Sequence, residues 1–191
     1  MECASRWVAA VRRLPATAIA LVRWRRFWRT ARRLPLALHC LAMTTKHNPD
    51  VPPGFHPFAA GGAFMAGNGP LYLRRLEGQA RFGFRVEARH CNPMGVLHGG
   101  MTASFCDMLL PLAVHVQHEP LSRRFLPTIS LQVDYLAPAA LGAWVEGTAE
   151  LLRATRSLVF AQGFVTTDGE PCARASGVFK IGPEFPADFR G

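Results

Sequence analysis

Apolar and polar residues alternate with a period of two in several segments of the chain. In residues 80–88 one set of alternate positions is apolar and the other carries mostly charged side chains. Successive side chains of a strand point to opposite faces, so this alternation predicts a strand with one face in a core. The same pattern predicts strands at residues 129–136, 145–151 and 172–181.

Residues 157–165 differ because both their odd-numbered and their even-numbered positions are mostly apolar. This pattern predicts a strand that is buried on both faces or that lies at a subunit contact. Short turn-like segments separate the strands after residue 128, and the Asp-Gly pair within residues 167–170 is typical of a hairpin. Strands joined by such short links run antiparallel.

Residues 98–117 show no period of two and are long enough for a helix. They are apolar almost all the way round, as expected for a helix that is enclosed by protein. The core-facing positions of the strand at residues 172–181 are mostly small, which lets a helix approach closely. We therefore expect an α+β domain in which an antiparallel sheet of five to six strands wraps around one long helix.

Charge is distributed unevenly along the 191 residues. Residues 1–42 contain nine arginines, no lysine and one acid, whereas the rest of the chain is nearly neutral. The overall charge of +9 therefore reflects the N-terminal segment, and we expect no nucleic-acid partner for the body. We divide the chain into an Arg/Trp-rich extension (residues 1–42), an irregular lead-in with at most one short helix (43–69), the main domain (70–182) and a C-terminal tail (183–191).

The extension contains an apolar run at residues 16–22 that is too short to cross a bilayer. Two functional interpretations are a targeting or membrane-surface segment and an electrostatic arm for an anionic partner. We favour a third, in which the protein starts at Met43 and the mature form lacks the extension. The mass of the native protein distinguishes these interpretations, since a mature N-terminus near residue 1 removes the third.

The five cysteines are odd in number and lack metal or redox spacing, which is typical of a reducing compartment. We therefore expect a cytoplasmic protein. Cys91 and Cys106 lie near the candidate site, and we interpret both as small buried hydrophobic residues and not as nucleophiles. His115 and His118 lack a third ligand at a suitable spacing, so they predict a polar helix end and no metal site.

A single carboxylate, Asp107, lies in the middle of the apolar helix. An ionised carboxylate enclosed by protein is costly without nearby donors, and enzymes use such groups as general bases or nucleophiles. A structural aspartate bonded to a neighbouring backbone group or hydroxyl is the alternative. Pro111 has no N–H to donate to the carbonyl of Asp107 and favours a bend, so we expect irregular backbone beside the carboxylate.

The sequence His98-Gly99-Gly100 lies where the chain enters the helix. Two glycines allow a ligand to approach the backbone, and the free N–H groups of a helix start carry the positive end of its dipole. Such donors suit a carbonyl oxygen that becomes negative during attack. Asn92 can add an amide donor from the preceding loop. An ordinary turn is the alternative for both segments.

His98 and Asp107 are nine residues apart, so on a helix they point to opposite sides and lie about 13 Å apart along the axis. They cannot easily act on one substrate within one chain. A two-fold dimer with antiparallel helices would place Asp107 of one protomer opposite the glycine pair of its partner. We therefore expect composite sites at a dimer interface.

The chain contains Asn92, the sequence GVLHGG and Asp107, followed by TISLQVDYLAPA and PCARASGVFKI. Together these residues resemble the PaaI-like branch of the hotdog-fold acyl-CoA thioesterases. The resemblance covers roughly residues 58–182. It implies a hotdog fold that forms a homodimer with a continuous sheet, or a dimer of dimers. The implied reaction is hydrolysis of an acyl-CoA to the free acid and coenzyme A, without a cofactor.

The resemblance also implies roles for individual residues. Asp107 is expected to act as general base on water or as nucleophile, and Thr128 is expected to orient the water. The Gly99 N–H, helped by Asn92, polarises the thioester carbonyl, and His98 supports this loop. Pro111 and the N-terminal extension lie outside the family pattern.

Further residues are expected to contact the substrate. Gly100 lies beside Gly99 and is assigned to substrate binding. Arg153 and Arg156 are weaker candidates for contacts with the phosphates of coenzyme A, with solvated turn residues as the favoured alternative for both.

We predict a thioesterase that acts on a medium-chain or aromatic acyl-CoA. A non-catalytic acyl-CoA-binding protein is one alternative, but Asp107, Asn92 and Thr128 together argue against it because binding needs no enclosed carboxylate. A hotdog enoyl-CoA hydratase is another, and the absence of an HFP motif lowers its weight. Membrane contact is expected only if the extension of residues 1–42 provides it, which we do not favour.

Overall fold

The computed structural model describes residues 51–59 and 62–186. The Arg/Trp-rich extension of residues 1–42 lies outside the described residues, as do the first part of the lead-in and the end of the tail.

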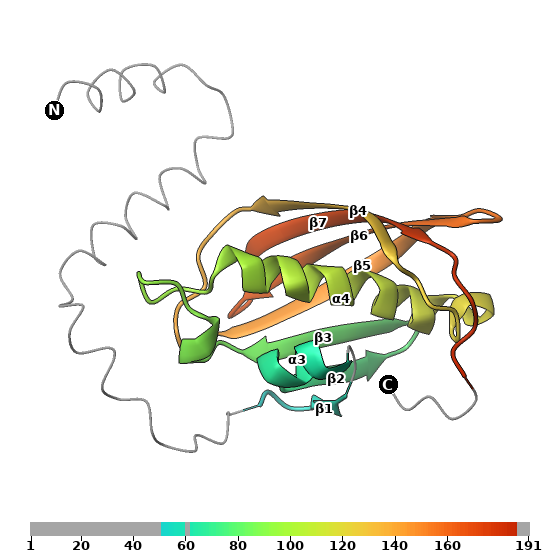
Figure 1. Ribbon diagram of the computed structural model, residues 1–191. Helices are drawn as coiled ribbons and strands as arrows, with labels where there is room; N and C mark the ends of the chain where they lie inside the picture. The colour runs from blue at the N-terminus through green and yellow to red at the C-terminus, as the bar shows by residue number, and fades with distance from the viewer. Residues whose placement is uncertain (1–50, 60–61, 187–191) are drawn as a thin grey trace, which may run out of the picture.

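The described chain forms one antiparallel sheet and one long helix (Figure 1). The strands are β1 (His56–Phe58), β2 (Leu71–Leu76), β3 (Gln79–Arg85), β4 (Thr128–Tyr135), β5 (Trp144–Ala154), β6 (Leu158–Thr167) and β7 (Glu170–Lys180). The helices are α3 (Gly62–Asn68) and α4 (Gly99–Gln117), with 3-10 turns η2 (Ala88–His90) and η3 (Glu119–Leu121). The strand order is β1-β2-β3-β5-β6-β7-β4, and all neighbouring strands are antiparallel. The predicted α+β architecture is confirmed.

The sheet has seven strands in place of the expected five to six. Five strands correspond to the segments located from the sequence, and the other two are β1 and β2. β1 comes from the segment that we expected to be irregular, whereas the short helix expected there is α3. β1 has only three residues and pairs its His56–Phe58 with Leu71–Leu73 of β2. A period of two cannot be recognised over three residues, so only the pairing defines this strand.

β6 is buried on one face and not on both. Val159, Ala161 and Val165 are buried against the core, whereas Phe164 on the opposite face is 51% exposed. The expectation of a strand buried on both faces is therefore wrong for the single protomer. A contact with another subunit remains the alternative explanation for the apolar outer face.

The helix α4 lies across the concave face of the sheet (Figure 1). Glycines permit this close approach, because a Cβ at Gly147 would lie 2.5 Å from Cδ2 of Leu109. A Cβ at Gly177 would likewise lie 3.0 Å from Cδ1 of Leu110. The prediction that small residues of the last strand allow the helix to approach is thus confirmed, and β5 contributes a second such position.

By length and composition alone, α4 would also pass as a membrane-spanning helix. Packing in the core of the domain explains why its side chains are apolar. Eight of its residues are buried against other parts of the protein, namely Met101, Thr102, Phe105, Cys106, Leu109, Leu110, Ala113 and Val114. In this fold α4 is therefore the core helix that packs on the sheet.

A second, smaller cluster of apolar side chains lies on the outer face of the sheet. Phe55, Tyr72 and Trp144 are buried together there, and Val51 packs against them. Tyr72 is on this face because its register partner is Gly83, one residue away from the core-facing Phe82. The N-terminal end of the described chain thus covers part of the convex face, on the side of the sheet opposite to α4.

Candidate active site

His98 joins the preceding loop to the start of α4. Its backbone N–H donates to the carbonyl of His90 at 2.8 Å, and its ring Nδ1 accepts from the N–H of Gly100 at 2.9 Å. The carbonyl of His98 accepts from the N–H groups of Met101 and Thr102 at 2.9 and 3.1 Å. His98 is therefore the N-cap of α4.

These bonds distinguish Gly99 from Gly100. The N–H of Gly100 is committed to the His98 ring, and a Cβ at Gly100 would lie 3.0 Å from His98 Nδ1, so glycine leaves room for the cap. Gly99 supplies the first N–H of the helix. This N–H belongs to the same peptide group as the His98 carbonyl, which accepts two hydrogen bonds. Such bonds polarise a peptide and strengthen its N–H as a donor. Gly99 is thus better placed than Gly100 to donate to a ligand.

Asn92 lies in a tight turn before the helix. Its Oδ1 accepts from the N–H of Met94 at 2.9 Å, and its backbone N–H donates to the carbonyl of Val96 at 2.8 Å. Because Oδ1 is used in the turn, the Nδ2 end of the amide is the end that can donate to a ligand. The turn and the capping histidine belong to one loop.

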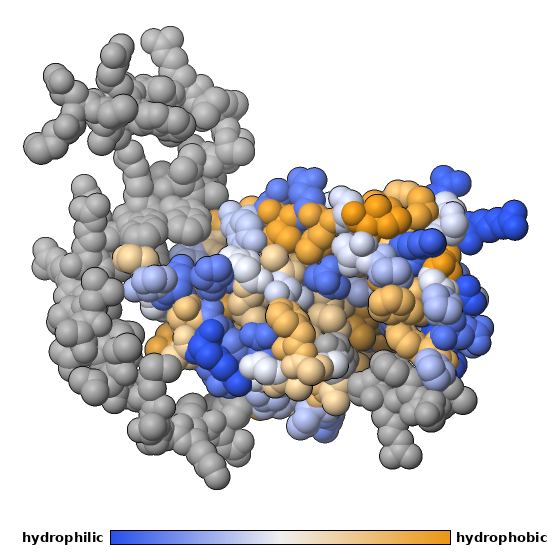
Figure 2. All heavy atoms as spheres, viewed as in Figure 1, coloured by the Kyte–Doolittle hydropathy of each residue, from blue (hydrophilic) through white to orange (hydrophobic). Residues whose placement is uncertain are grey.

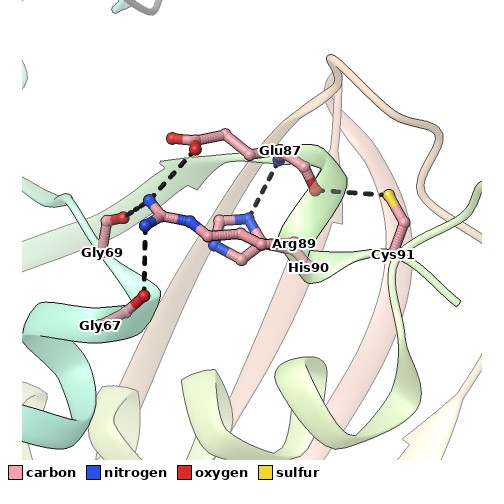
Figure 3. A network of polar contacts seen from close by, with 6 residues as sticks. All are labelled: Gly67, Gly69, Glu87, Arg89, His90 and Cys91. Atoms are coloured by element: carbon pink, nitrogen blue, oxygen red, sulfur yellow. Dashed lines mark hydrogen bonds and ion pairs between the residues drawn. The ribbon is translucent and has the colours of Figure 1, made fainter. Parts of the chain in front are cut away.

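A polar network anchors this loop to α3 (Figure 3). Arg89 forms an ion pair with Glu87 at 3.1 Å and donates to the carbonyls of Gly67 and Gly69. The backbone N–H of Glu87 donates to Nδ1 of His90 at 3.0 Å, and burial lowers the pKa of His90. No sequence pattern indicates this network, because its partners come from segments that only the fold brings together.

Asp107 is held by a hydroxyl from the edge strand. Thr128 Oγ1 donates to Asp107 Oδ1 at 2.6 Å. Both residues were predicted site residues, and the structure brings them together although they are 21 positions apart. The helix α4 continues through Pro111 to Gln117, so the proline does not end it.

The expectation that α4 is enclosed all round is wrong for the single protomer. One side of the helix is only partly buried, and Asp107 lies on that side. The partly buried positions recur at helical spacing and include Ser104, Asp107, Met108, Pro111, Leu112 and His115. We call this set the open stripe of α4. Its apolar members, Met108, Pro111 and Leu112, have side chains of the kind that another protein surface covers.

The cysteines near the site are structural. Cys106 is fully buried, and this burial, with smaller contributions from nearby Cys172 and Asp107, raises the pKa of its thiol to about 12. Cys91 is partly buried, and its Sγ–H donates to the carbonyl of Glu87 at 3.4 Å. Nucleophilic chemistry requires a thiolate, so Cys106 is unreactive near neutral pH.

The remaining predicted residues lie toward the C-terminal end of α4. There Gln117 donates to the carbonyl of Ala149 and accepts from the N–H of Leu151, which ties the helix end to β5. Arg153 and Arg156 are exposed just beyond this part of β5. Within one protomer they therefore lie near the opposite end of the helix from Gly99.

His115 is also accounted for within the fold. Its Nε2 donates to the carbonyl of Arg124 at 2.9 Å, and burial lowers the pKa of its ring. This contact ties the C-terminal part of α4 to the segment that leads into β4.

The edge strand β4 also reaches the start of the helix. Tyr135, the last residue of β4, donates its hydroxyl proton to the carbonyl of Gly99 at 2.9 Å. Tyr135 was not among the predicted site residues, because nothing in its local pattern indicates a partner 36 positions earlier. The structure thus forms two groupings, Asp107 with Thr128, and His98, Gly99 and Gly100 with Tyr135.

A protein-family model described as the thioesterase superfamily matches residues 94–173, which span the helix start, Asp107 and Thr128. Over these residues the chain is similar to the thioesterase superfamily. Its fold is accordingly the hotdog fold, and it is a thioester hydrolase, as predicted.

Three proteins illustrate this similarity. The "Putative esterase PA0474" of Pseudomonas aeruginosa is 28% identical over 133 residues, which are 69% of this chain and 98% of that protein. The acyl-coenzyme A thioesterase 13 of Mus musculus is 33% identical over 79 residues, which are 40% of this chain and 53% of that protein. A mutant of the phenylacetic acid degradation protein PaaI from Thermus thermophilus is 26% identical with a TM-score of 0.51, covering 62% of this chain and 97% of that one. The resemblance to the PaaI-like branch is confirmed.

Proposed function

We propose that this thioester hydrolase acts on acyl-CoA, with Asp107 of one protomer and Gly99 of its partner at each active site. The observation that carries the proposal is the carboxylate on the open stripe of α4, held at 2.6 Å by the Thr128 hydroxyl. In a family of thioester hydrolases, a positioned and accessible carboxylate suits a general base or a nucleophile.

The free edge of β4 supports a dimer. β4 pairs with β7 on one side, and in the described part of the chain no strand pairs with its other side. An unpaired edge presents backbone N–H and C=O groups to another strand. Ile129 on this strand is 58% exposed, and Figure 2 shows apolar side chains along the part of the surface where β4 lies. Antiparallel pairing of two β4 strands about a two-fold axis would satisfy both edges.

The same dimer would bring the two site groupings together. Within one protomer, Gly99 and Asp107 are eight residues apart on α4, which corresponds to about 12 Å along the axis. A partner helix that runs antiparallel beside the open stripe would place its own Gly99 opposite Asp107. The stripe would then lose its contact with bulk water, which strengthens the electrostatic interactions at the site.

The proposed reaction uses these groups directly. Asp107 accepts a proton from water as the water oxygen bonds to the thioester carbon, and the Thr128 hydroxyl keeps one carboxylate oxygen in place. The carbonyl oxygen becomes negative and accepts hydrogen bonds from the Gly99 N–H and the Asn92 amide. Cleavage of the carbon–sulfur bond then releases coenzyme A, whose thiolate takes up the proton that Asp107 accepted from the water. Direct attack by Asp107, followed by hydrolysis of the resulting anhydride, is the second route.

We propose a medium-chain or aromatic acyl group as the substrate. The mouse relative is named as an acyl-CoA thioesterase, which supports an acyl-CoA substrate, and the Thermus protein as a phenylacetic acid degradation protein, which supports an aromatic acyl group. An open pocket of about 730 Å³ lies between β1, α3 and β2 and is lined in part by Arg89. Its lining is mainly apolar, and such a lining suits an uncharged acyl group.

Replacing the carboxylate tests the proposal. Asp107→Asn keeps the size of the side chain but removes the base, so we expect hydrolysis to fall by about 100-fold to 10,000-fold while the protein stays dimeric. Steady-state release of free thiol from a panel of medium-chain and aromatic acyl-CoAs measures the effect.

The matched control is Asp134→Asn. Asp134 lies on β4 like Thr128, but it forms a surface ion pair with Arg174 at 3.1 Å, so we expect turnover close to wild type. Wild-type turnover in Asp107→Asn would contradict the assigned role. If the wild-type protein binds acyl-CoA without releasing thiol, the alternative of a non-catalytic binding protein is correct.

A further inference from the structure

We infer that Tyr135 is a positioning residue, which holds the Gly99 peptide in the orientation that polarises the thioester carbonyl. The inference rests on the proposed function, because the Gly99 N–H is the proposed donor. Tyr135 itself does not contact the reacting atoms and acts through Gly99.

Two kinds of contact join Tyr135 to Gly99. The phenol hydroxyl donates to the Gly99 carbonyl at 2.9 Å. The ring also lies against the glycine, because a Cβ at Gly99 would be 3.4 Å from Cε1 and 3.5 Å from Cζ of Tyr135. The polar end and the aromatic body of one side chain therefore both restrain the first residue of α4.

The start of α4 needs such a restraint. Glycine is the most flexible residue, and the first N–H groups of a helix have no partner within it. A donor to an oxyanion must lie within about 2.7–3.1 Å of the oxygen, so small rotations of the Gly99 peptides reduce catalysis. His98 restrains the peptide before Gly99 through its carbonyl, and Tyr135 restrains the peptide after it. Gly99 is thereby held on both sides.

The position of Tyr135 links this restraint to the edge strand. Tyr135 pairs with Ala173 of β7, which fixes its backbone. Ala173 is buried in the core, so the Tyr135 side chain also faces the helix side of the sheet. Thr128, which holds Asp107, begins the same strand. Both groupings of the site are therefore attached to the strand that we expect to pair with the partner protomer.

The hydroxyl is suited to donation and not to proton transfer. Burial, with a smaller contribution from Cys106, raises the pKa of Tyr135 above its ordinary value. The phenol consequently stays protonated near neutral pH and keeps its hydrogen for the Gly99 carbonyl.

The test compares the two tyrosines of the chain. Tyr135→Phe removes the hydroxyl and keeps the ring, and we expect kcat to fall about tenfold, with KM within about twofold of wild type. Tyr72→Phe is the matched control, since Tyr72 lies in the cluster on the outer face of the sheet, and we expect wild-type kcat from it. The mass in solution and the unfolding midpoint should be unchanged in both variants.

Hydrogen exchange provides a readout that does not depend on turnover. We expect peptides covering the start of α4 to exchange faster in Tyr135→Phe, while peptides from its C-terminal half exchange as in wild type. The pH profile of kcat/KM should keep its shape, because Tyr135 is not an acid or base in the reaction. Unchanged exchange at the helix start would overturn the inference.

The outcomes separate this inference from the proposed function. If the wild-type protein releases no thiol from any acyl-CoA, the proposed function fails. If the wild type is active and Tyr135→Phe matches it in kcat, only the role of Tyr135 fails. A loss of kcat that accompanies a lower unfolding midpoint or dissociation of the dimer would mean a structural role and would also overturn the inference.

Discussion

The hydrogen bond from Thr128 to Asp107 is compatible with two roles of the aspartate, a catalytic one and a structural one in which the hydroxyl merely satisfies a carboxylate. Thr128→Val keeps the shape of the side chain and removes the hydroxyl. If Asp107 is catalytic, we expect kcat to fall about tenfold or more, because the carboxylate is no longer held toward the water, and unfolding should change little. Thr128→Ser should restore most of the turnover, as measured by thiol release.

The opposite result identifies the structural role. A Thr128→Val protein that unfolds at a markedly lower denaturant concentration but keeps the wild-type kcat would show that the hydrogen bond stabilises the fold and does not serve the reaction.

At the scale of the elements, the position of α4 on the sheet depends on glycines at the contact. In Gly147→Ala the added Cβ would lie 2.5 Å from Leu109 Cδ2 and 3.2 Å from Phe105 Cε1, so the Leu109 side chain or the helix must shift. We expect the free energy of unfolding to fall by about 1–3 kcal/mol. Urea denaturation at a fixed protein concentration measures the change.

Gly67→Ala in α3 is the corresponding control, because a Cβ there meets no atom within 4 Å. Replacing a helical glycine by alanine in open space should leave stability unchanged or raise it by about 0.5–1 kcal/mol. Equal losses in the two variants would contradict the account of helix packing.

At the scale of the whole molecule, the proposed active site needs a second protomer along β4. Ile129→Asp places a charge on this strand, where the side chain is 58% exposed in the single protomer, and we expect dimers to dissociate and thiol release to be lost. Leu152→Asp makes the same change at a 53% exposed position on β5, and we expect this protein to remain dimeric and active. Light scattering after size-exclusion chromatography gives the masses.

A dimeric, active Ile129→Asp protein would show that β4 is not the dimer contact. The proposal that each active site combines residues of two protomers along this strand would then have to be abandoned.

Much of the architecture could be predicted because periodicity is a local property. The four alternating segments became strands β3, β4, β5 and β7, and the segment of residues 98–117 became α4 within one residue. The prediction failed where a neighbour decides the outcome. β1 exists because it pairs with β2, and the two faces of β6 differ because only one faces the core.

For the site, the sequence by itself determined the chemical groups: a carboxylate within an apolar helix and a glycine pair at that helix's start, in a pattern similar to a known family. Their partners were decided only by tertiary structure. Tyr135 contacts Gly99, and Thr128 contacts Asp107, across 36 and 21 positions. Such contacts arise when the sheet curves around the helix, and no periodicity of two or 3.6 residues encodes them. The same physical reason explains why Asp107 lies on an open stripe of the single protomer and not in an enclosed core.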